Sequence, residues 1–339
     1  MIAVNPYIHS IEYYLPENKL TNKELSNFFG DWSEEKIYSK IGVKERRISN
    51  KNEYVSDIAE KSARKLFDKQ NIDPNEINFL ILCTQSPDYY LPTTACILQE
   101  KLNLPKTCGA FDFNLGCSGF IYGLSIAESL INNNTVSNVL LITADTYTKH
   151  VNQMDKSTRT IFGDAGAAIL LKSGSEENKI GKFVFGTDGS GANNLIVPSG
   201  GMKIPRSDKT SIESTDKYGN TRSLNNLYMN GPKIYEFVLE HIPPTVEKIL
   251  LKNNLDKEEI DLFVFHQASS YMLEKLRRRL KIPKEKFFAN IENIGNTVSA
   301  SIPIALKDAQ NSGLIKNGSK IMLVGFGVGY SWGGTIITY

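Results

Sequence analysis

AFDFNLGCSGFIYG, residues 110–123, passes from an apolar run typical of a strand into the first turn of an expected helix. From Phe120 to Ile131, apolar residues recur at steps of three and four, as on one face of a helix. Cys117 therefore lies where a strand leads into a helix N-terminus, whose unpaired amides favour the reactive thiolate. A buried cysteine without chemistry is the alternative interpretation.

The rest of the chain repeats the strand and helix pattern. Short apolar runs bounded by turn residues predict buried strands at 79–83, 139–143, 167–171, 262–265 and 321–326. Between them lie segments of helical period, such as 55–67. Alternating strands and helices predict an α/β fold.

A loop-rich region separates two stretches of comparable size. Residues 172–228 are rich in Gly, Ser, Asn, Asp and Lys, which predicts turns and long loops, with a short hairpin around GKFVFG at 181–186. We expect two halves, 1–173 and 174–339, each with its own strands and helices. No repeat of fixed period is visible in the sequence.

Composition bounds the class of protein. The 339 residues, 41% hydrophobic and 22% charged, are enough for a large core, and a net charge of +2 gives no indication of nucleic-acid binding. The four cysteines match neither a CxxC zinc pair nor a dense disulfide framework. No apolar run approaches the ~18 residues of a membrane span. We therefore expect a cytoplasmic protein with no membrane or metal partner.

Two polar residues beyond the cysteine occupy similar positions at the ends of elements. His266 follows the expected strand 262–265, and ligands of α/β proteins gather at the carboxyl ends of strands. Asn296 precedes an expected helix that contains Ile302 and Leu306. A structural histidine and a helix-capping asparagine are the alternatives. Together, Cys117, His266 and Asn296 could run acyl transfer as nucleophile, proton handler and amide donor.

The glycine-rich segment GFGVGYSWGG, residues 325–334, follows the last apolar run. Glycine turns allow backbone amides to point at an anion, so an oxyanion hole and a plain tight turn are both open. It is not a dinucleotide fingerprint, because no helix or βαβ unit follows it.

A papain-like protease also combines a cysteine with a downstream histidine and asparagine. Such an enzyme carries its cysteine near the mature N-terminus of a secreted chain, whereas Cys117 lies well inside this one. The context therefore disfavours a protease.

Several segments, taken in order, resemble the β-ketoacyl-acyl-carrier-protein synthase III family of the thiolase superfamily. The resemblance covers essentially the whole chain and is carried by IGVKERRI (41–48), NLGCSGFIYGLSIA (114–127), IFGDAGAA (161–168), VPSGG (197–201), FVFHQAS (263–269), GNTVSASIPIAL (295–306) and GFGVGYSWGG (325–334). It implies a thiolase-like fold of two similar α/β halves stacked as five layers, αβαβα, and a homodimer.

The resemblance also implies roles for single residues. Cys117 would take the acyl group from an acyl-CoA, and His266 and Asn296 would bind the thioester carbonyl of malonyl-carrier protein as CO₂ leaves. The backbone amides of Cys117 and Val328 would form the oxyanion hole. CoA and phosphopantetheine are substrates in this scheme, and no metal or redox cofactor is expected.

Further positions follow from the resemblance. The acyl pocket would contain Phe162 and Met229, with Leu91 reaching across the dimer where acetyl-specific members often carry a bulkier Phe. Residues expected at the CoA or pantetheine are Lys36, Lys40, Lys156, Gly231, Tyr235 and Ser269. Carrier-protein docking would fall to Arg277, Arg278 and Lys281, for which a solvated helix face is the alternative.

This chain departs from the family pattern at the CoA end. The family often holds the adenine between a Trp and an Arg, but the matching positions carry Lys36 and Lys40, with Trp32 one turn earlier, and Lys156 replaces another Arg. Lysine keeps the charge and loses the planar stacking surface. CoA could then bind differently or weakly, or the acyl donor could be a carrier protein.

We therefore expect a synthase III-like acyltransferase that performs decarboxylative Claisen condensation, in fatty-acid initiation or in a specialised acyl pathway. One alternative is acyl transfer to an oxygen or nitrogen nucleophile without condensation. Another is a non-catalytic dimeric partner protein.

Overall fold

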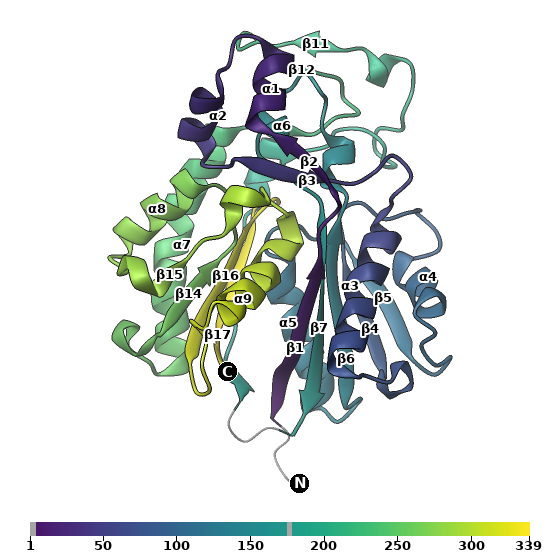
Figure 1. The fold of residues 1–339 in the computed structure, drawn as a ribbon, viewed down its shortest axis with the longest axis vertical. Helices are drawn as coiled ribbons and strands as arrows, with labels where there is room; N and C mark the ends of the chain where they lie inside the picture. Colours follow the sequence, from purple (N-terminus) through teal and green to yellow (C-terminus); the bar gives the residue numbers. More distant parts are fainter. Residues whose placement is uncertain (1–4, 175–177) are drawn as a thin grey trace.

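The computed structural model describes residues 5–174 and 178–339, which fold around two sheets (Figure 1). The first sheet has the order β1 (Pro6–Tyr14), β7 (Ala165–Ser173), β6 (Asn138–Asp145), β4 (Phe79–Cys83) and β5 (Gly109–Phe113). The second has the order β15 (Phe287–Phe288), β14 (Leu262–Phe265), β16 (Lys320–Gly327), β17 (Ser331–Thr338) and β8 (Lys179–Ile180). All five apolar runs of the sequence lie in these strands.

The two sheets share one pairing pattern. In the first, β4 runs parallel to β5 and β6, β6 is antiparallel to β7, and β7 is antiparallel to β1. In the second, β14 runs parallel to β15 and β16, β16 is antiparallel to β17, and β17 is antiparallel to β8. The expected similarity of the halves is therefore present in the structure, although the sequence shows no repeat.

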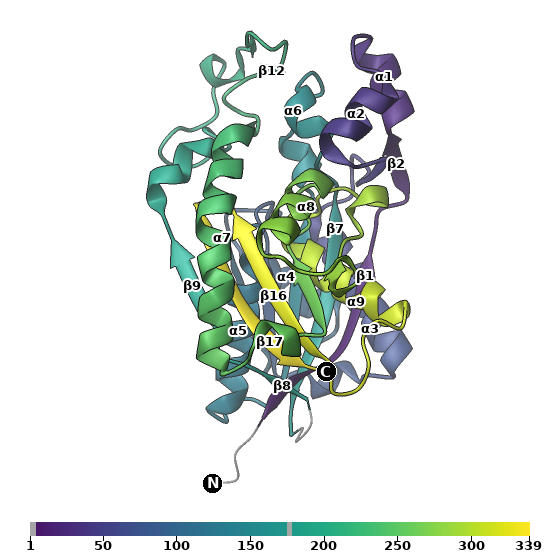
Figure 2. The same cartoon turned by 90° about the vertical axis from the view of Figure 1, so that its left-hand side faces the viewer.

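Helices make the other three layers. Helices α5 (Gly119–Asn132) and α9 (Ser301–Asn311) lie between the sheets, α3 (Val55–Gln70) and α4 (Thr94–Lys101) cover the outer face of the first, and α7 (Gly231–Asn253) and α8 (Ser270–Arg279) that of the second (Figures 1 and 2). Alternation along β16 explains the layering, since Ile321 and Leu323 pack in the middle layer whereas Met322 and Val324 pack toward α7 and α8. The expected αβαβα order is confirmed.

The segment GKFVFG does not form the expected hairpin. Strands β8 and β9 (Val184–Thr187) both pair with β17 and extend the edge of the second sheet. An isolated two-stranded hairpin is only marginally stable, whereas pairing with β17 satisfies the same backbone groups within a large sheet. Residues 175–177 of the predicted loop region lie outside the described ranges.

The elements that remain gather largely at one end of the molecule (Figures 1 and 2). At that end lie β2 (Asn18–Thr21), α1 (Asn22–Phe29), α2 (Glu34–Ile41), β3 (Glu45–Ile48), α6 (Lys156–Arg159), β11 (Ser214–Thr215) and β12 (Thr221–Arg222). Short strand β10 (Leu195–Ile196) pairs with β13 (Tyr228–Met229).

Short 3₁₀ helices complete the connections, at Pro74–Glu76, Tyr147–His150, Gly189–Asn194, Lys209–Ser211, Lys257–Glu259, Lys284–Lys286, Ile291–Asn293 and Val298–Ala300. Within residues 5–174 and 178–339, none of the helices combines the length and the hydropathy needed to cross a bilayer.

Candidate active site

Cys117, His266 and Asn296 come from three distant segments and line one cavity of about 450 Å³. Cys117 stands two residues before α5 and is only 5% exposed. His266 follows β14 directly, and Asn296 precedes the 3₁₀ helix Val298–Ala300 and α9. The structure therefore brings together the three residues that the sequence singled out.

The turn between β16 and β17 packs closely against Cys117. A Cβ atom built on Gly327 would lie 2.7 Å from the Cys117 Cβ and 2.9 Å from its Sγ, so only glycine fits there. The backbone amides of Cys117 and Val328 both stabilise the thiolate of Cys117. Next to it, the hydroxyls of Ser118 and Ser331 lie 2.7 Å apart, and Ser331 donates to the Val328 carbonyl at 2.8 Å. This contact fixes the Val328 amide beside the sulfur.

His266 is held from two sides. Its backbone N–H donates to the Val324 carbonyl at 2.8 Å, and its Nδ1 lies 2.7 Å from the hydroxyl of Ser301. Nε2 is thus the ring nitrogen left for a ligand. Burial lowers the pKa of His266 to about 3, so the imidazole is neutral at pH 7.

Asn296 has a fixed amide orientation. Its side-chain Oδ1 accepts from the Val298 N–H at 2.9 Å, and its Nδ2 lies 3.4 Å from the Ala268 carbonyl. Its backbone bonds to Ile161 and Gly163, each at 2.9 Å. Because Oδ1 is occupied, the NH₂ group is the part of the side chain that can donate into the cavity.

The thiol of Cys117 is neutral in the free protein. Burial raises its pKa to about 12, and the negative charge of Asp145 adds to the rise. The two backbone amides lower it, but by less. The thiolate-favouring helix end expected from the sequence is therefore present and outweighed by burial.

Comparisons with known proteins agree with this geometry. The model of the 3-oxoacyl-[acyl-carrier-protein (ACP)] synthase III family matches residues 111–189, and the model of its C-terminal part matches residues 250–339. The β-ketoacyl-[acyl-carrier-protein] synthase III of Caldanaerobacter subterraneus subsp. tengcongensis is 36% identical over 327 residues, covering 96% of this chain and 95% of its own. The chain belongs to the β-ketoacyl-acyl-carrier-protein synthase III family.

Further relatives of the family support the assignment. The synthase III of Campylobacter curvus is 38% identical over 332 residues, covering 97% of this chain and 96% of its own. A crystal structure of a 3-oxoacyl-(acyl-carrier-protein) synthase III superimposes with a TM-score of 0.97 at 45% identity, covering 99% of this chain and 100% of that one. The enzyme from Thermus thermophilus gives 0.87 at 32% identity, covering 98% and 99%. The chain therefore has the thiolase fold of these condensing enzymes.

Five more of the predicted residues line the same cavity: Phe162, Met229, Gly231, Tyr235 and Ser269. Leu91 does not, and its side chain is 85% exposed on the single chain. Leu195 and Phe326, which were not predicted, also line the cavity. Leu195 lies within the loop-rich region, where nothing local marks a pocket residue, whereas Phe326 belongs to the glycine-rich segment 325–334 and could have been inferred from it.

A second cavity, of about 970 Å³, adjoins the first through Leu195, which lines both. Val328 and Gly329 of the glycine turn lie on its wall, as does Tyr147. The glycine turn therefore stands between the two spaces.

The three predicted CoA-binding lysines lie outside the cavity walls. The Nζ atoms of Lys36 and Lys40 lie 5.3 and 5.6 Å from the centre of the Trp32 ring, so both ammonium groups stack on the indole. Lys156 is only 8% exposed and forms an ion pair with Asp31 at 2.6 Å. The positive charge of Lys156 is thus already matched by a carboxylate.

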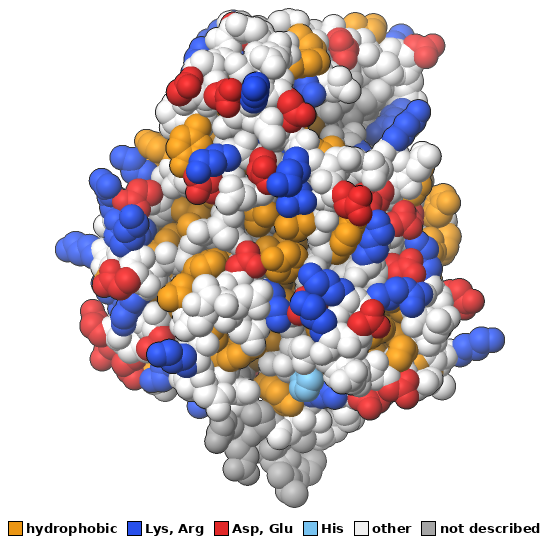
Figure 3. Space-filling model, viewed as in Figure 1, with side chains coloured by type: hydrophobic (Ala, Val, Ile, Leu, Met, Phe, Trp, Pro, Cys, Tyr) orange, Lys and Arg blue, Asp and Glu red, His pale blue; other side chains and the backbone are white. Residues whose placement is uncertain are grey.

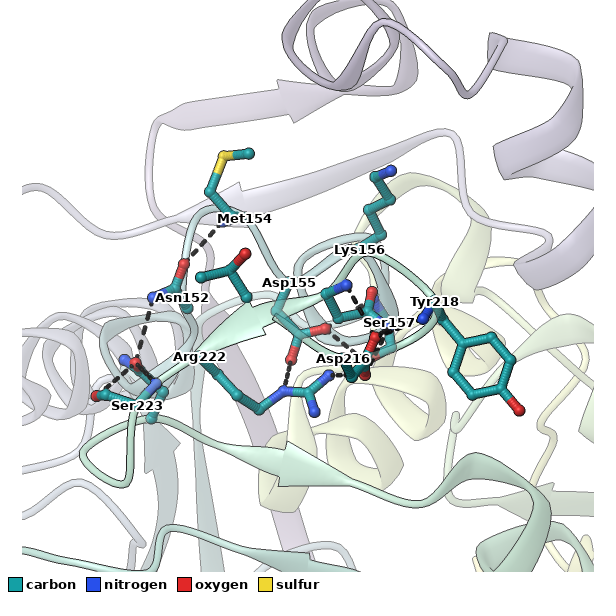
Figure 4. A network of polar contacts seen from close by, with 12 residues as sticks. Asn152, Met154, Asp155, Lys156, Ser157, Asp216, Tyr218, Arg222 and Ser223 are labelled. Atoms are coloured by element: carbon teal, nitrogen blue, oxygen red, sulfur yellow. Dashed lines mark hydrogen bonds and ion pairs between the residues drawn. The ribbon is translucent and has the colours of Figure 1, made fainter. Parts of the chain in front are cut away.

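A polar network next to Lys156 fixes the β11–β12 segment (Figure 4). Arg222 donates to Asp155 and to Asp216, each at 3.0 Å, and Asp155 caps α6 through the N–H of Ser157. A Cβ atom built on Gly219, between the two strands, would lie 3.8 Å from Lys156 Nζ. The network holds this segment against the helix that carries Lys156.

The predicted docking residues differ in exposure and in whether their charges are already paired within the chain. Arg277 donates to Glu274 at 2.8 Å and to the Ile282 carbonyl at 2.7 Å, which ties it to its own helix end. Arg278 also pairs with Glu274 at 2.5 Å, although its side chain is 71% exposed. Lys281 is exposed just beyond α8. Blue and red side chains accordingly alternate along the α8 flank in Figure 3.

We predict that Gly327→Ala slows acylation of Cys117 by roughly a hundredfold, the usual effect of losing one oxyanion donor. The added methyl group would displace the cysteine and the neighbouring Val328 amide. The measurement is the rate of mass gain with an acyl thioester. Gly189→Ala, where a Cβ meets open space, is the matched control. Equal rates for both variants would contradict the close contact.

We also predict that alkylation of Cys117 by iodoacetamide rises with pH, about tenfold per unit from about pH 6 to about pH 9, without a plateau. The pKa of the thiol is raised to about 12, so the thiolate fraction keeps growing over this range. Peptide mass spectrometry separates Cys117 from the exposed Cys96. A plateau near neutral pH would indicate a preformed ion pair instead.

Proposed function

We propose that this chain transfers an acyl group from a thioester to Cys117 and then condenses it with malonyl-carrier protein, with loss of CO₂. The observation that carries the proposal is the single cavity into which a thiol, a neutral imidazole and an amide NH₂ open together. Membership of the synthase III family supports the same reaction.

In the first half-reaction, the Cys117 sulfur attacks the thioester carbonyl. The oxyanion forms beside the amides of Cys117 and Val328, each of which is worth about 3 kcal/mol of barrier. The thiolate of the donor leaves and takes up the proton that the cysteine loses. Because the free thiol is neutral, this proton must leave the sulfur during the attack.

In the second half-reaction, the malonyl thioester carbonyl accepts hydrogen bonds from His266 Nε2–H and from the Asn296 NH₂. A neutral His266 with Nδ1 facing the Ser301 hydroxyl can carry its hydrogen on Nε2, as this role requires. The bond to the carboxylate breaks, CO₂ leaves, and the electron pair becomes an enolate held by the two donors. The enolate carbon attacks the acyl-Cys117 carbonyl and releases Cys117 as a thiolate, which takes up a proton from water to restore the neutral thiol.

The proposed substrates are an acyl thioester of CoA or of a carrier protein, and malonyl-carrier protein, with no further cofactor. The ion pair between Lys156 and Asp31 removes one cation from CoA binding, which favours a carrier protein as an alternative donor. Lys281 and the exposed Arg278 would contact an acidic carrier protein. Fatty-acid initiation and a specialised acyl pathway both fit this chemistry.

We also propose that the enzyme is a cytoplasmic homodimer. Strand β5 is the last strand of the first sheet, and within the described residues its outer edge pairs with no other strand. Nearby in sequence, Tyr89, Tyr90 and Leu91 are exposed, an apolar group that a second copy could cover. All four cysteines are free, in keeping with a reducing compartment.

The test of the function is intact-mass analysis with acyl-CoA and acyl-carrier protein. Wild type should gain one acyl group, and Cys117→Ala none. On adding malonyl-carrier protein, CO₂ should be released, whereas His266→Ala and Asn296→Ala should acylate normally and lose roughly a hundredfold or more in CO₂ release. Acylation of another nucleophile without CO₂ would indicate a simple acyltransferase, and no mass gain would contradict every enzymatic interpretation.

If the enzyme is a homodimer, we expect it to sediment with the mass of two chains at micromolar concentration. Leu91→Ala should leave that mass unchanged, because Tyr89 and Tyr90 would still be covered, while it alters the preferred acyl-chain length, because the Leu91 side chain would reach the partner's pocket. The measurement pairs sedimentation velocity with labelling of Cys117 by acyl-CoAs of graded length. A monomer, or an unchanged length profile, would count against this arrangement.

A further inference from the structure

Asp145 is a fully buried carboxylate behind the nucleophile, at the carboxyl end of β6. It accepts a hydrogen bond from the Gln85 backbone N–H at 2.8 Å and from the Ser299 hydroxyl at 2.5 Å. Within residues 5–174 and 178–339, no lysine or arginine forms a salt bridge with it. A buried charge held by hydrogen bonds alone is costly, which calls for an explanation.

The hydrogen bond to Ser299 reaches the segment that orients Asn296. Val298, between these two residues, has φ +53°, a left-handed conformation that a β-branched residue rarely adopts. Such a conformation persists only when its surroundings hold it. The N–H of this strained Val298 is the donor to Asn296 Oδ1, at 2.9 Å. Contacts that hold residues 298 and 299 in place therefore also hold the side-chain amide of Asn296 in its orientation.

We propose that Asp145 is a positioning residue for the decarboxylation step, holding Ser299 and through it the Val298 N–H that turns the Asn296 NH₂ toward the substrate carbonyl. The inference rests on the condensation proposed above and adds a residue that does not line the cavity. An asparagine side chain could not replace the carboxylate here. Its NH₂ group is a hydrogen-bond donor, and it would face the Gln85 N–H or the Ser299 hydroxyl, which are donors as well.

The same charge acts on the nucleophile in the opposite direction. Burial raises the pKa of Asp145 to about 7, with Asp164 adding to the rise, and hydrogen bonds from Ser299 and Gln85 lower it. When ionised, Asp145 disfavours the thiolates of Cys117 and Cys83 and the phenolate of Tyr147. Removing the negative charge of Asp145 should therefore lower the pKa of Cys117. The same change should weaken the contacts that orient the Asn296 amide.

These opposite effects separate positioning from general damage. Asp145→Asn should lower the turnover number for malonyl-carrier-protein decarboxylation roughly ten- to a hundredfold, as for a lost hydrogen bond to a charged group. Ser299→Ala should lower it similarly. At fixed pH near 8, Asp145→Asn should be alkylated at Cys117 faster than wild type, whereas Ser299→Ala, which keeps the carboxyl group and loses only a hydrogen bond that lowers its pKa, should be accelerated less.

Thr143→Val is the matched control. It lies two residues earlier on β6, its buried hydroxyl has no hydrogen-bond partner, and valine has nearly the same shape. It should leave both rates unchanged. Should Asp145→Asn not fold, Ser299→Ala carries the decarboxylation test by itself.

The inference is overturned if decarboxylation and alkylation of Cys117 fall by the same factor in both variants, or if neither rate changes. A wild-type enzyme that acylates Cys117 but releases no CO₂ from malonyl-carrier protein would instead contradict the proposed function, and this inference with it. Release of CO₂ by the wild-type enzyme, together with slower decarboxylation and faster alkylation of Cys117 in Asp145→Asn, would support both the proposed function and this inference.

Discussion

The contact between the start of α5 and the β16–β17 turn is the constraint on which the site depends. Cys117 belongs to one half and Gly327 to the other, and a single methyl group on Gly327 would already collide with the cysteine. Gly325 is equally constrained, since its Cβ would lie 2.8 Å from the Ser118 Cα. The hydroxyl pair of Ser118 and Ser331 adds a direct polar link across this boundary. Close packing of the start of α5 against the end of β16 thus places the backbone amide of Val328 beside a thiol.

The same packing determines the electrostatic character of the chemistry. Because the site is buried, the resting state carries a neutral thiol and a neutral imidazole rather than an ion pair. Neutral donors suit a carbonyl that turns into an enolate, since they stabilise developing charge without stabilising a competing charged ground state. The buried carboxyl group of Asp145 lies behind the nucleophile and accepts a hydrogen bond from Ser299, in the segment that follows Asn296.

Much of this arrangement could be predicted from local sequence. The apolar runs 79–83 and 262–265 coincide with β4 and β14, because buried strands need little beyond hydrophobicity and flanking turn residues. Tertiary properties could not be predicted in this way. The conformation of GKFVFG depends on pairing with β17, about 150 residues further along the chain. The protonation state of Cys117 depends on burial rather than on its position at a helix N-terminus. Asp145 did carry a signal, as an acidic residue ending an apolar strand, but its role needed the bond to Ser299.

The similarity of the two halves explains why the residues of the site are distributed between them. Each half contributes one middle-layer helix, and both helices begin at the site: α5 just after Cys117, and α9 at Ser301, whose hydroxyl meets His266. The carboxyl ends of β14 and β6 bring His266 and Asp145 to the same region. In the proposed reaction, one half would hold the acyl group and the other the carbonyl that becomes the enolate, and the carbon–carbon bond would form where the two helix starts face each other. The similar fold of each half thus places a helix N-terminus and a strand end at the site. The side chains at these points differ, and the proposed reaction assigns the nucleophile to one half and the hydrogen-bond donors to the other.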